Sequence, residues 1–379
     1  MSIKSKYYKL TKDEFAQYLD SLKNAPGTRF FMEQSPHPYF YCMLPETYQA
    51  LMKLNRARIE FDKVMDEFSE FGRRQLVQSF LIDEIKATNT IESIASTRHD
   101  IFSIINKVKS AENKKIVSIG NAYVLLLQTA GDPVCRPEDV RIIYDLLMEN
   151  AIDGKDMPDG EFFRKGPVYI TDGMRKIHTG IEGEASINQA MEDFLGEYNS
   201  ESEVFEKMII SHFLIETIHP YYDGNGRLGR FLFSKGVYDG TGSLSAFLAA
   251  SALAENRKKY YNALKNARED KEFGCLNDFV ETVAGMLRGR IEGATVELKK
   301  KLKQINNPKR IDGLSRSGEK VYALIAEATV LSEYGVSNTE IVRCTGISKR
   351  TAVTEVNKLR SRGLLADTKI GYYTYHKLK

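Results

Sequence analysis

The chain has 379 residues, of which 42% are hydrophobic and 28% charged, so we expect an ordinary globular protein of two or three domains. Its 54 basic and 51 acidic residues nearly cancel, so the composition does not demand a polyanionic partner. We expect a cytoplasmic protein without membrane contact, because apolar runs are too short to span a bilayer, the N-terminus lacks the apolar core of a signal peptide, and the four cysteines are scattered.

Residues 1–110 are expected to form an N-terminal helical region. Within it, residues 1–45 mix aromatic side chains with prolines and indicate an irregular arm. Beyond them, apolar residues recur at helical spacing, which predicts one helix ending near Phe68 and a second from about Leu76 to Asn89–Ile94. The apolar faces of these helices could form the interface of a homodimer.

Residues 111–295 are expected to form the main helical domain. Helical periodicity predicts helices near 116–126, 137–147, 187–195, 205–218 and 276–293. Gly236 and Gly240-Thr241-Gly242 indicate a loop after another helix that starts near Gly226.

A different pattern interrupts the helices. Val168, Tyr169 and Ile170 are β-prone, and Asp172-Gly173 is a pair typical of a tight hairpin turn. This pattern predicts a short β-hairpin from about Val168 to His178.

The richest chemistry lies in one consecutive stretch, His219 to Arg230, with the sequence HPYYDGNGRLGR. An apolar helix delivers His219 at its C-terminal end, where Pro220 stops it. A second apolar helix starts near Gly226, so the glycines lie where the unpaired backbone N–H groups of a helix N-terminus point outward. Such a helix start is a ready binding site for an anion.

Each polar residue of this stretch has a function if the anion is a nucleotide phosphate. Arg227 and Arg230 are three residues apart on one helix face, and each can offer a planar fork to phosphate oxygens. Asp223 could hold a divalent cation, and Asn225 could donate to the phosphate that is attacked. His219 is the one group here that can take a proton near neutral pH, which indicates a general base for an incoming hydroxyl.

The stretch resembles the signature of the Fic (filamentation induced by cAMP) family, H-P-F-x-[DE]-G-N-G-R-x-x-R, with Tyr221 where phenylalanine is usual. The resemblance implies a mainly α-helical enzyme that transfers AMP from ATP, with Mg²⁺, to a serine, threonine or tyrosine hydroxyl of a target protein. The retained GNGR distinguishes the chain from the Doc-like branch, which transfers phosphate. By this resemblance His219 is the catalytic base, Asp223 binds the metal, and the nucleotide-binding residues include Gly224, Asn225, Gly226, Arg227 and Arg230.

Upstream, the segment Thr88-Asn89-Thr90-Ile91-Glu92-Ser93 resembles the inhibitory motif of the same family, [ST]-x-x-x-E-[GN]. Thr88 and Glu92 match, whereas Ser93 departs from the usual glycine or asparagine. The resemblance implies that Glu92 pairs with Arg230, occupies the place of the γ-phosphate and misdirects ATP. With a divalent cation, such a glutamate can also help a water to remove AMP from a modified target. The alternative is a surface glutamate near a helix C-terminus, a mildly unfavourable place for an acid.

Two further segments match the family by their position in the chain. The expected hairpin corresponds to a flap that binds the target segment by strand pairing, here with Val168, Tyr169 and Ile170. The segment from Arg257 to Leu264 has the pattern R-x-x-Y-Y-x-x-L, in which Tyr261 would approach the adenine. A plain surface hairpin and core packing of the tyrosines are the alternatives.

The C-terminal part has a pattern of its own. Residues 296–318 are strongly basic and contain Asn306-Asn307-Pro308, which breaks any helix, so we expect a solvated helix end and a linker. Residues 319–379 resemble a winged helix-turn-helix, with Gly363–Tyr373 as the wing. The expected fold class is therefore mainly α: a Fic-type helical core with a short β-hairpin flap, plus a small C-terminal winged-helix domain.

If the C-terminal domain binds DNA, its second helix would present Lys349, Arg350 and Thr351 to the major groove. The inner face of this helix would carry Val353, Val356 and Leu359, and the phosphates would meet Lys358, Arg360 and Arg362. Such domains also dock proteins. The alternative to an enzyme is a DNA-binding transcriptional regulator whose Fic core senses nucleotide or is inactive.

Overall fold

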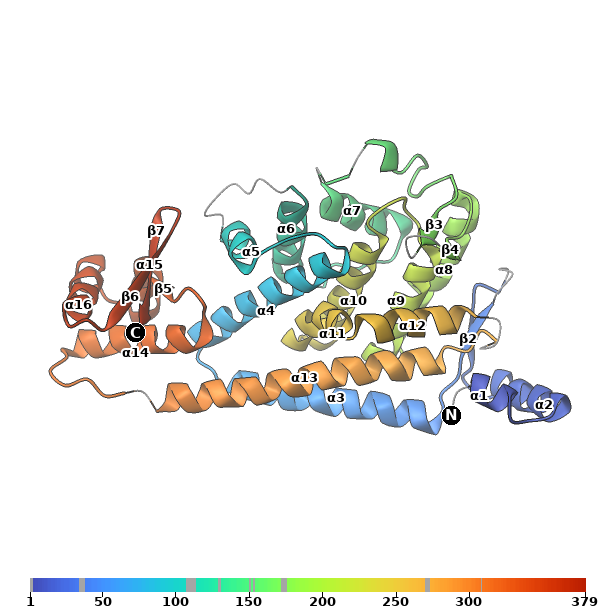
Figure 1. Cartoon of the computed structure of the whole chain (residues 1–379), viewed down its shortest axis with the longest axis horizontal. Helices are drawn as coiled ribbons and strands as arrows, with labels where there is room; N and C mark the ends of the chain where they lie inside the picture. Colours follow the sequence, from blue (N-terminus) through green and yellow to red (C-terminus); the bar gives the residue numbers. More distant parts are fainter. Residues whose placement is uncertain are drawn as a thin grey trace.

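The computed structural model is mainly α-helical with small antiparallel sheets, and a large helical unit is followed by a smaller C-terminal unit at the other end of the long axis (Figure 1). It describes residues 3–33, 38–106, 114–128, 131–149, 151–152, 154–171, 176–269, 273–307 and 309–379. Among these residues, every helix is too short or too polar to cross a membrane.

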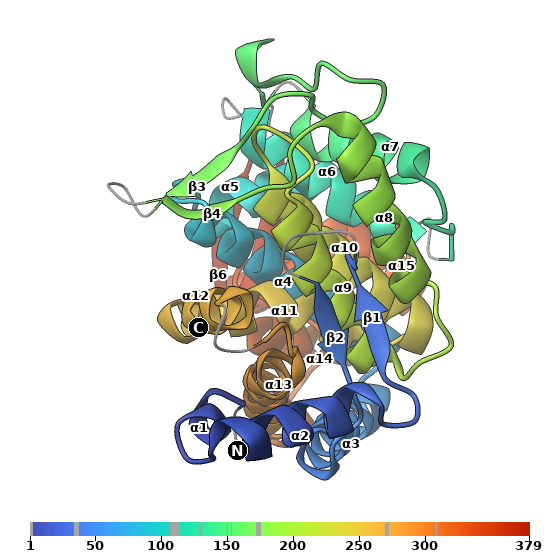
Figure 2. The same ribbon diagram turned by 90° about the vertical axis from the view of Figure 1, so that its right-hand side faces the viewer.

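The first 45 residues are more regular than the irregular arm that we predicted. They contain α1 (Ile3–Tyr7), α2 (Lys12–Lys23) and a hairpin of β1 (Arg29–Phe31) and β2 (Tyr39–Tyr41). Thr11 and Glu14 build a capping box at the start of α2, a helix signal that the aromatic and proline content concealed. Both α1 and α2 lie next to the ends of helices α3 and α13 (Figure 2).

Helices α3 (Pro45–Asp66) and α13 (Asn277–Asn306) run side by side along the molecule (Figure 1). Helix α13 is 30 residues long, so the predicted end of the core helix near 293 is wrong, and the helix ends at Asn306, where the Asn306-Asn307-Pro308 break was predicted. Leu298 and Leu302 continue the buried stripe while neighbouring lysines stay exposed, and this apolar stripe carries the helix through the basic stretch.

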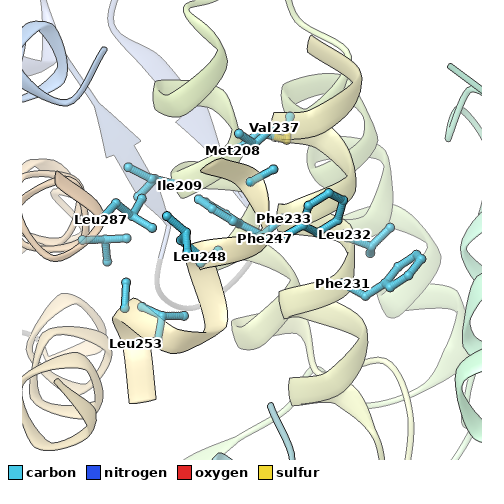
Figure 3. Packing of buried hydrophobic residues seen from close by; sticks show 14 of the residues in the cluster. Met208, Ile209, Phe231, Leu232, Phe233, Val237, Phe247, Leu248, Leu253 and Leu287 are labelled. Carbon is cyan, nitrogen blue, oxygen red and sulfur yellow. The ribbon is translucent and has the colours of Figure 1, made fainter. Parts of the chain in front are cut away.

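The central unit is built around α9 (Val204–Ile218) and α10 (Asn225–Thr241), which pack against each other and are largely buried. Figure 3 shows Met208 of α9 beside Val237 of α10, with Phe247 and Leu248 below them. The other helices of this unit are α4 (Glu70–Ile91), α5 (Arg98–Ile105), α6 (Lys114–Gln128), α7 (Pro137–Met148), α8 (Glu184–Tyr198), α11 (Ala249–Glu255), α12 (Arg257–Arg268) and the 3₁₀ helices η1 (Gly154–Asp156) and η2 (Leu244–Leu248).

Helix α10 continues through Gly236 and Gly240, so the loop that we predicted there is wrong. At Gly236 a Cβ atom would overlap the sulfur of Met208. This glycine is therefore required by the close crossing of α9 and α10 and does not mark a helix end. The helix ends at Gly242, whose φ of 65° lies in the left-handed region that favours glycine.

The predicted β-hairpin is present as β3 (Tyr169–Thr171) and β4 (Lys176–Thr179), which pair antiparallel at the edge of the central unit (Figure 2). Its predicted turn, Asp172-Gly173, lies outside the described residues. Gly180 N donates to Val168 O (3.1 Å) and Ile181 N donates to Ile218 O (3.0 Å). The base of the hairpin therefore lies against the C-terminal end of α9.

The C-terminal unit packs α14 (Arg316–Leu331), α15 (Asn338–Thr345) and α16 (Lys349–Ser361) around a core of its own. Strands β5 (Val336–Ser337), β6 (Leu365–Ile370) and β7 (Tyr373–Leu378) form an antiparallel sheet in the order β5-β7-β6. On α16, Val356 and Leu359 are buried as predicted, but Val353 is 37% exposed and Ala352 takes the inner position instead.

Helix α4 joins the two units. Near its N-terminus Phe71 lies in the core of the C-terminal unit, and Gln75 donates to Glu340 (3.1 Å). In the central unit, the buried Glu84 carboxylate accepts hydrogen bonds from Ala250 N (2.8 Å) and Ser234 Oγ (2.9 Å). Burial raises the pKa of Glu84 to about 7. These contacts fix α4 along its length, and its last turn reaches the candidate site.

Candidate active site

His219 follows the last turn of α9 and caps the helix. Its φ of 54° and ψ of 61° lie in the left-handed region, and its N–H donates to Ile215 O (3.0 Å). Pro220 cannot continue the helix and disfavours the helical conformation of the residue before it. The imidazole Nδ1 lies 3.4 Å from Glu216 O. A proton on Nδ1 would leave the lone pair on Nε2, which is the form that a general base requires.

Asn225 holds the loop between α9 and α10. Its side-chain amide accepts from Tyr221 N (2.9 Å) and donates to Tyr221 O (2.7 Å). We predicted that this amide donates to a phosphate. In the structure it bonds to the backbone of its own loop instead. Gly224, with a φ of 81°, completes the turn, and a Cβ there would lie 2.6 Å from Met148 Sδ. The first turn of α10 then leaves its backbone N–H groups without intrahelical partners.

Arg227 lies on this first turn, and only 3% of its side chain is exposed. Its Nη2 donates to Asp223 Oδ2 (3.0 Å), whereas Nε and Nη1 have no hydrogen-bond partner in the described part of the chain. A buried donor that stays unpaired costs roughly 1–3 kcal/mol. Arg227 is therefore suited to an anion that offers two oxygens.

Asp223 is the carboxylate of the loop, and 44% of its side chain is exposed. Its Oδ1 accepts from Gly224 N (2.7 Å). Within the described ranges, no three His, Cys, Asp or Glu side chains gather in a way that could hold a metal ion. Mg²⁺ is commonly held by one or two carboxylates together with substrate phosphates, and an exposed carboxylate beside an anion site fits that pattern.

Arg230 lies one turn further along α10, and its guanidinium is bonded to residues at the C-terminal end of α4. Its Nη2 donates to Glu92 Oε1 (2.5 Å) and its Nε donates to Thr88 Oγ1 (3.1 Å). Burial lowers the pKa of Arg230, but the Glu92 and Glu216 carboxylates outweigh it, and the net pKa is raised. A Cβ on Gly226 would lie 2.5 Å from Glu92 Oε1. The Glu92 carboxylate therefore rests on the first turn of α10, where a helix attracts negative charge.

Ser93 follows Glu92 with a φ of 58°, in the left-handed region. A residue other than glycine or asparagine adopts this conformation at a cost of roughly 1–2 kcal/mol. This backbone requirement explains why glycine or asparagine would suit the position, and the departure to serine leaves the turn strained.

Sequence reasoning missed two buried titratable residues on α9. Glu216 lies close to Arg230, its Oε1 has no hydrogen-bond partner among the described residues, and burial raises the pKa of its carboxyl. His212 Nε2 lies 2.8 Å from Tyr260 OH, and burial lowers the pKa of His212 to about 3, so this imidazole is neutral. The signal that could have revealed both is polar residues within an almost entirely apolar helix.

The two tyrosines of the R-x-x-Y-Y-x-x-L segment have different surroundings. Tyr260 is buried against His212, whereas Tyr261 is 44% exposed and lies within electrostatic range of Arg230 and Glu92. Arg257 lies over the Tyr261 ring at 5.8 Å from its centroid. Tyr261, and not Tyr260, therefore has the exposure that contact with a nucleotide base requires.

On the hairpin, Tyr169 is 57% exposed and Val168 is partly buried, whereas the side chain of Ile170 lies outside the described set. The residues predicted to contact DNA lie far from this site, on α16 at the other end of the molecule (Figure 1). Lys349 and Arg350 are exposed, and Thr351 N donates to Ser348 Oγ at the helix start (3.1 Å). The three residues predicted to meet phosphates bond within the C-terminal unit: Lys358 to Glu355, Arg360 to Asp367, and Arg362 to Asp312 O.

Tyr221 yields a stability prediction. Its ring is fully buried and stacks on Tyr144 at 3.5 Å between centroids, but its hydroxyl has no hydrogen-bond partner among the described residues. Replacing Tyr221 by phenylalanine keeps the stack and removes the unpaired hydroxyl, so we expect the free energy of unfolding to rise by about 1–3 kcal/mol. Denaturant unfolding of both proteins measures this change. An unchanged or lower stability would show that the hydroxyl is satisfied, for example by a buried water.

Part of the chain, including the candidate active site, is similar to the Fic/DOC family. The model of the Fic/DOC family matches residues 134–235, which include the hairpin and the whole stretch from His219 to Arg230. The chain is similar to a Fic family protein from Desulfovibrio desulfuricans G20, with a TM-score of 0.56 and 19% identity over 89% of this chain and 97% of that one. At this identity the similarity shows the fold alone, and it confirms the predicted mainly helical, Fic-like architecture.

Two curated relatives match over shorter segments. The probable protein adenylyltransferase aq_aa38 of Aquifex aeolicus (strain VF5) is 42% identical over 67 residues, 18% of this chain and 19% of its own length. The protein adenylyltransferase Fic of Drosophila willistoni is 28% identical over 139 residues, 36% of this chain and 26% of its own length. The matching part therefore spans about a fifth to a quarter of these relatives.

Proposed function

We propose that this protein is a protein adenylyltransferase that Glu92 holds in an inhibited state, with ATP as the nucleotide and a hydroxyl of a target protein as the acceptor. One observation carries the proposal: two arginines one turn apart on α10 are in opposite states. Arg227 has two buried donors without partners among the described residues, whereas the Glu92 carboxylate occupies Arg230. A carboxylate in a place that suits a phosphate is what an inhibited nucleotide site needs. The names of the two curated relatives support the same reaction class.

In the proposed reaction the oxygen of the target hydroxyl attacks the α-phosphorus of ATP, and His219 Nε2 takes the hydroxyl proton. The new P–O bond forms as the bond to pyrophosphate breaks, and pyrophosphate leaves. Arg227 and Arg230 would bind the phosphates, and the strand edge at Val168–Ile170 would align the target segment. Asp223 would hold a Mg²⁺ ion, which when bound supplies positive charge that offsets the negative charge of the leaving group.

Inhibition would follow from competition for Arg230. The γ-phosphate of ATP needs the guanidinium that Glu92 occupies, so ATP binds in a pose whose α-phosphorus is turned away from His219. When Glu92 is displaced, both arginines become available and Tyr261 lies beside the adenine. With a divalent cation, the same carboxylate would be placed to orient a water that removes AMP from a modified target.

The test uses wild-type protein, Glu92→Gly and a matched control, Glu67→Gly. Glu67 is exposed and, like Glu92, is the C-cap of a helix, here α3. Each protein is incubated with ATP and Mg²⁺, and its intact mass is followed over time. We expect an added AMP on Glu92→Gly at a rate at least about tenfold above the other two, equivalent to about 1.4 kcal/mol in the competition for Arg230.

Two outcomes would count against the proposal. Equal modification of all three proteins would retain nucleotide transfer and discard inhibition by Glu92. Unmodified Glu92→Gly, with ATP or with other nucleoside triphosphates and with added cell protein as acceptor, would contradict the transferase itself.

A second candidate function is DNA binding by the C-terminal unit, which its charge distribution favours. Residues 309–379 contain 13 Lys and Arg against 7 Asp and Glu, although the whole chain carries only +3. Three of these acids bond to residues of α4 or α5 or to the cap of α4: Glu327 to Ser69, Glu333 to Arg98 and Glu340 to Gln75. These three acids thus face α4 and α5, whereas Lys349 and Arg350 are exposed at the start of α16.

We expect the protein to bind duplex DNA with a Kd that rises steeply between about 50 and 200 mM salt. Replacing Lys349 and Arg350 together by alanine should lower the slope of log Kd against log salt by about 1–2. The same change at Lys299 and Lys300, exposed on α13, should leave the slope unchanged. Fluorescence anisotropy measures both quantities, and an absence of binding at about 50 mM salt would discard this candidate.

A further inference from the structure

Arg164 is a fully buried arginine that the proposed reaction does not use. Its guanidinium donates to three backbone carbonyls: Nε to His219 O (3.0 Å), Nη1 to Gly166 O (2.5 Å) and Nη2 to Ile181 O (2.7 Å). Its backbone N–H donates to Pro220 O (3.2 Å). One side chain therefore joins the residue that ends α9 to the segments on both sides of the β3–β4 hairpin.

The charge of Arg164 is placed where carbonyl dipoles favour it. Burial lowers the pKa of the guanidinium, but the group stays a cation because the usual pKa is so high. It lies at the C-terminal end of α9, where the helix dipole stabilises a positive charge. The planar guanidinium can donate in three fixed directions, whereas the ammonium of a lysine is a compact point charge.

Gly180 keeps the space for this guanidinium. A Cβ on Gly180 would lie 2.5 Å from Arg164 Nη2 and 3.0 Å from His219 Cβ. The residue that follows β4, the Arg164 guanidinium and His219 thus meet with no room for one further carbon. A shift of the hairpin base would therefore displace His219 through these contacts.

We infer that Arg164 is a positioning residue: it holds His219 in its left-handed conformation and fixes the base of the hairpin to it, so that a target segment paired to the hairpin is presented to the imidazole in register. The inference rests on the proposed function, because it gives the base and the acceptor of that reaction a common support. Arg164 itself touches neither substrate nor reacting atoms in this role.

The first test measures self-modification in the Glu92→Gly protein, with Arg164→Lys and Gly180→Ala as added changes. A misplacement of about 1 Å costs about 10²-fold in rate, so we expect the rate at saturating ATP to fall by about that factor in both variants. The half-saturating ATP concentration should stay close to that of the parent, and thermal unfolding checks that each variant is still folded at the assay temperature. Arg141→Lys is the control, since Arg141 also donates to a backbone carbonyl, Phe162 O (3.4 Å), but away from His219.

Rates within threefold of the parent would overturn the inference. So would a loss of rate accompanied by an equal loss of ATP affinity, since that pattern shows a merely structural role. If the parent transfers no AMP at all, the proposed function fails, and a second measurement then decides the inference by itself.

That second measurement follows the His219 imidazole by NMR in wild-type protein and in Arg164→Lys, with the signals assigned by their loss in His219→Ala. We expect the His219 signals to move and their titration midpoint to change by at least about 0.5 pH unit, because the ring changes its surroundings. Signals and midpoint that coincide with those of the wild type would overturn the inference, whether or not the protein transfers nucleotide.

Discussion

In the Glu92→Gly protein, replacing His219 by alanine is expected to lower the rate of AMP transfer by about 10²- to 10⁴-fold, the usual contribution of a general base. His219 stands at the start of the loop that leads to α10, whose first turn carries Arg227, and its Nδ1 lies 3.4 Å from Glu216 O. Because the imidazole acts on the acceptor hydroxyl and not on the phosphates, nucleotide affinity should stay within about twofold.

The measurement combines time courses of intact mass with calorimetric titration of a non-hydrolysable ATP analogue. His99→Ala is the control, since His99 is exposed and lies beside Tyr334, next to the C-terminal unit. Transfer that persists at the parent rate would remove His219 as the base. A parallel collapse of affinity would assign the imidazole to binding and not to proton transfer.

Replacing Arg227 by alanine in the same Glu92→Gly protein is expected to weaken nucleotide binding by at least about 100-fold. Nε and Nη1 of this buried side chain are both unpartnered among the described residues, and each charge-assisted hydrogen bond to a phosphate would contribute roughly 1.5 kcal/mol or more. Folding should be little affected, because the bond that is lost joins Arg227 to the half-exposed Asp223.

Calorimetric titration with ATP and Mg²⁺ checks this prediction, with thermal unfolding recorded alongside. Arg141→Ala is a matched control, because Arg141 also pairs with an aspartate four residues away, Asp145, on α7. Affinity within threefold of the parent would mean that the open donors of Arg227 do not face the nucleotide. The Arg230 guanidinium would then be the main phosphate contact.

The centre of the candidate site could be predicted because its chemistry is local in the chain. The stretch from His219 to Arg230 is contiguous, Pro220 ends one helix, and apolar spacing starts the next close to Gly226. The pairing of Glu92 with Arg230 could be predicted only from a family motif, because the two residues lie far apart in the sequence. The structure now shows their ion pair directly.

What could not be predicted depends on which distant segments touch. Asn225 was assigned to a phosphate, but its amide bonds to the loop backbone, a choice that no spacing reveals. Gly236 was taken as a helix breaker, because its role depends on Met208 of a neighbouring helix. Arg164 carried no pattern of its own, and its importance follows from burial, which only the packed structure discloses.

Helix α4 belongs to both units. Phe71 lies in the C-terminal core, and Glu92 caps the other end of the same helix, 21 residues further along or about 32 Å away. A ligand that binds the C-terminal unit more tightly when α4 is displaced would, by thermodynamic reciprocity, loosen Glu92 from Arg230 by the same factor. ATP bound in place of Glu92 would strengthen that ligand equally. A single coupling free energy would thus describe both ends of the helix.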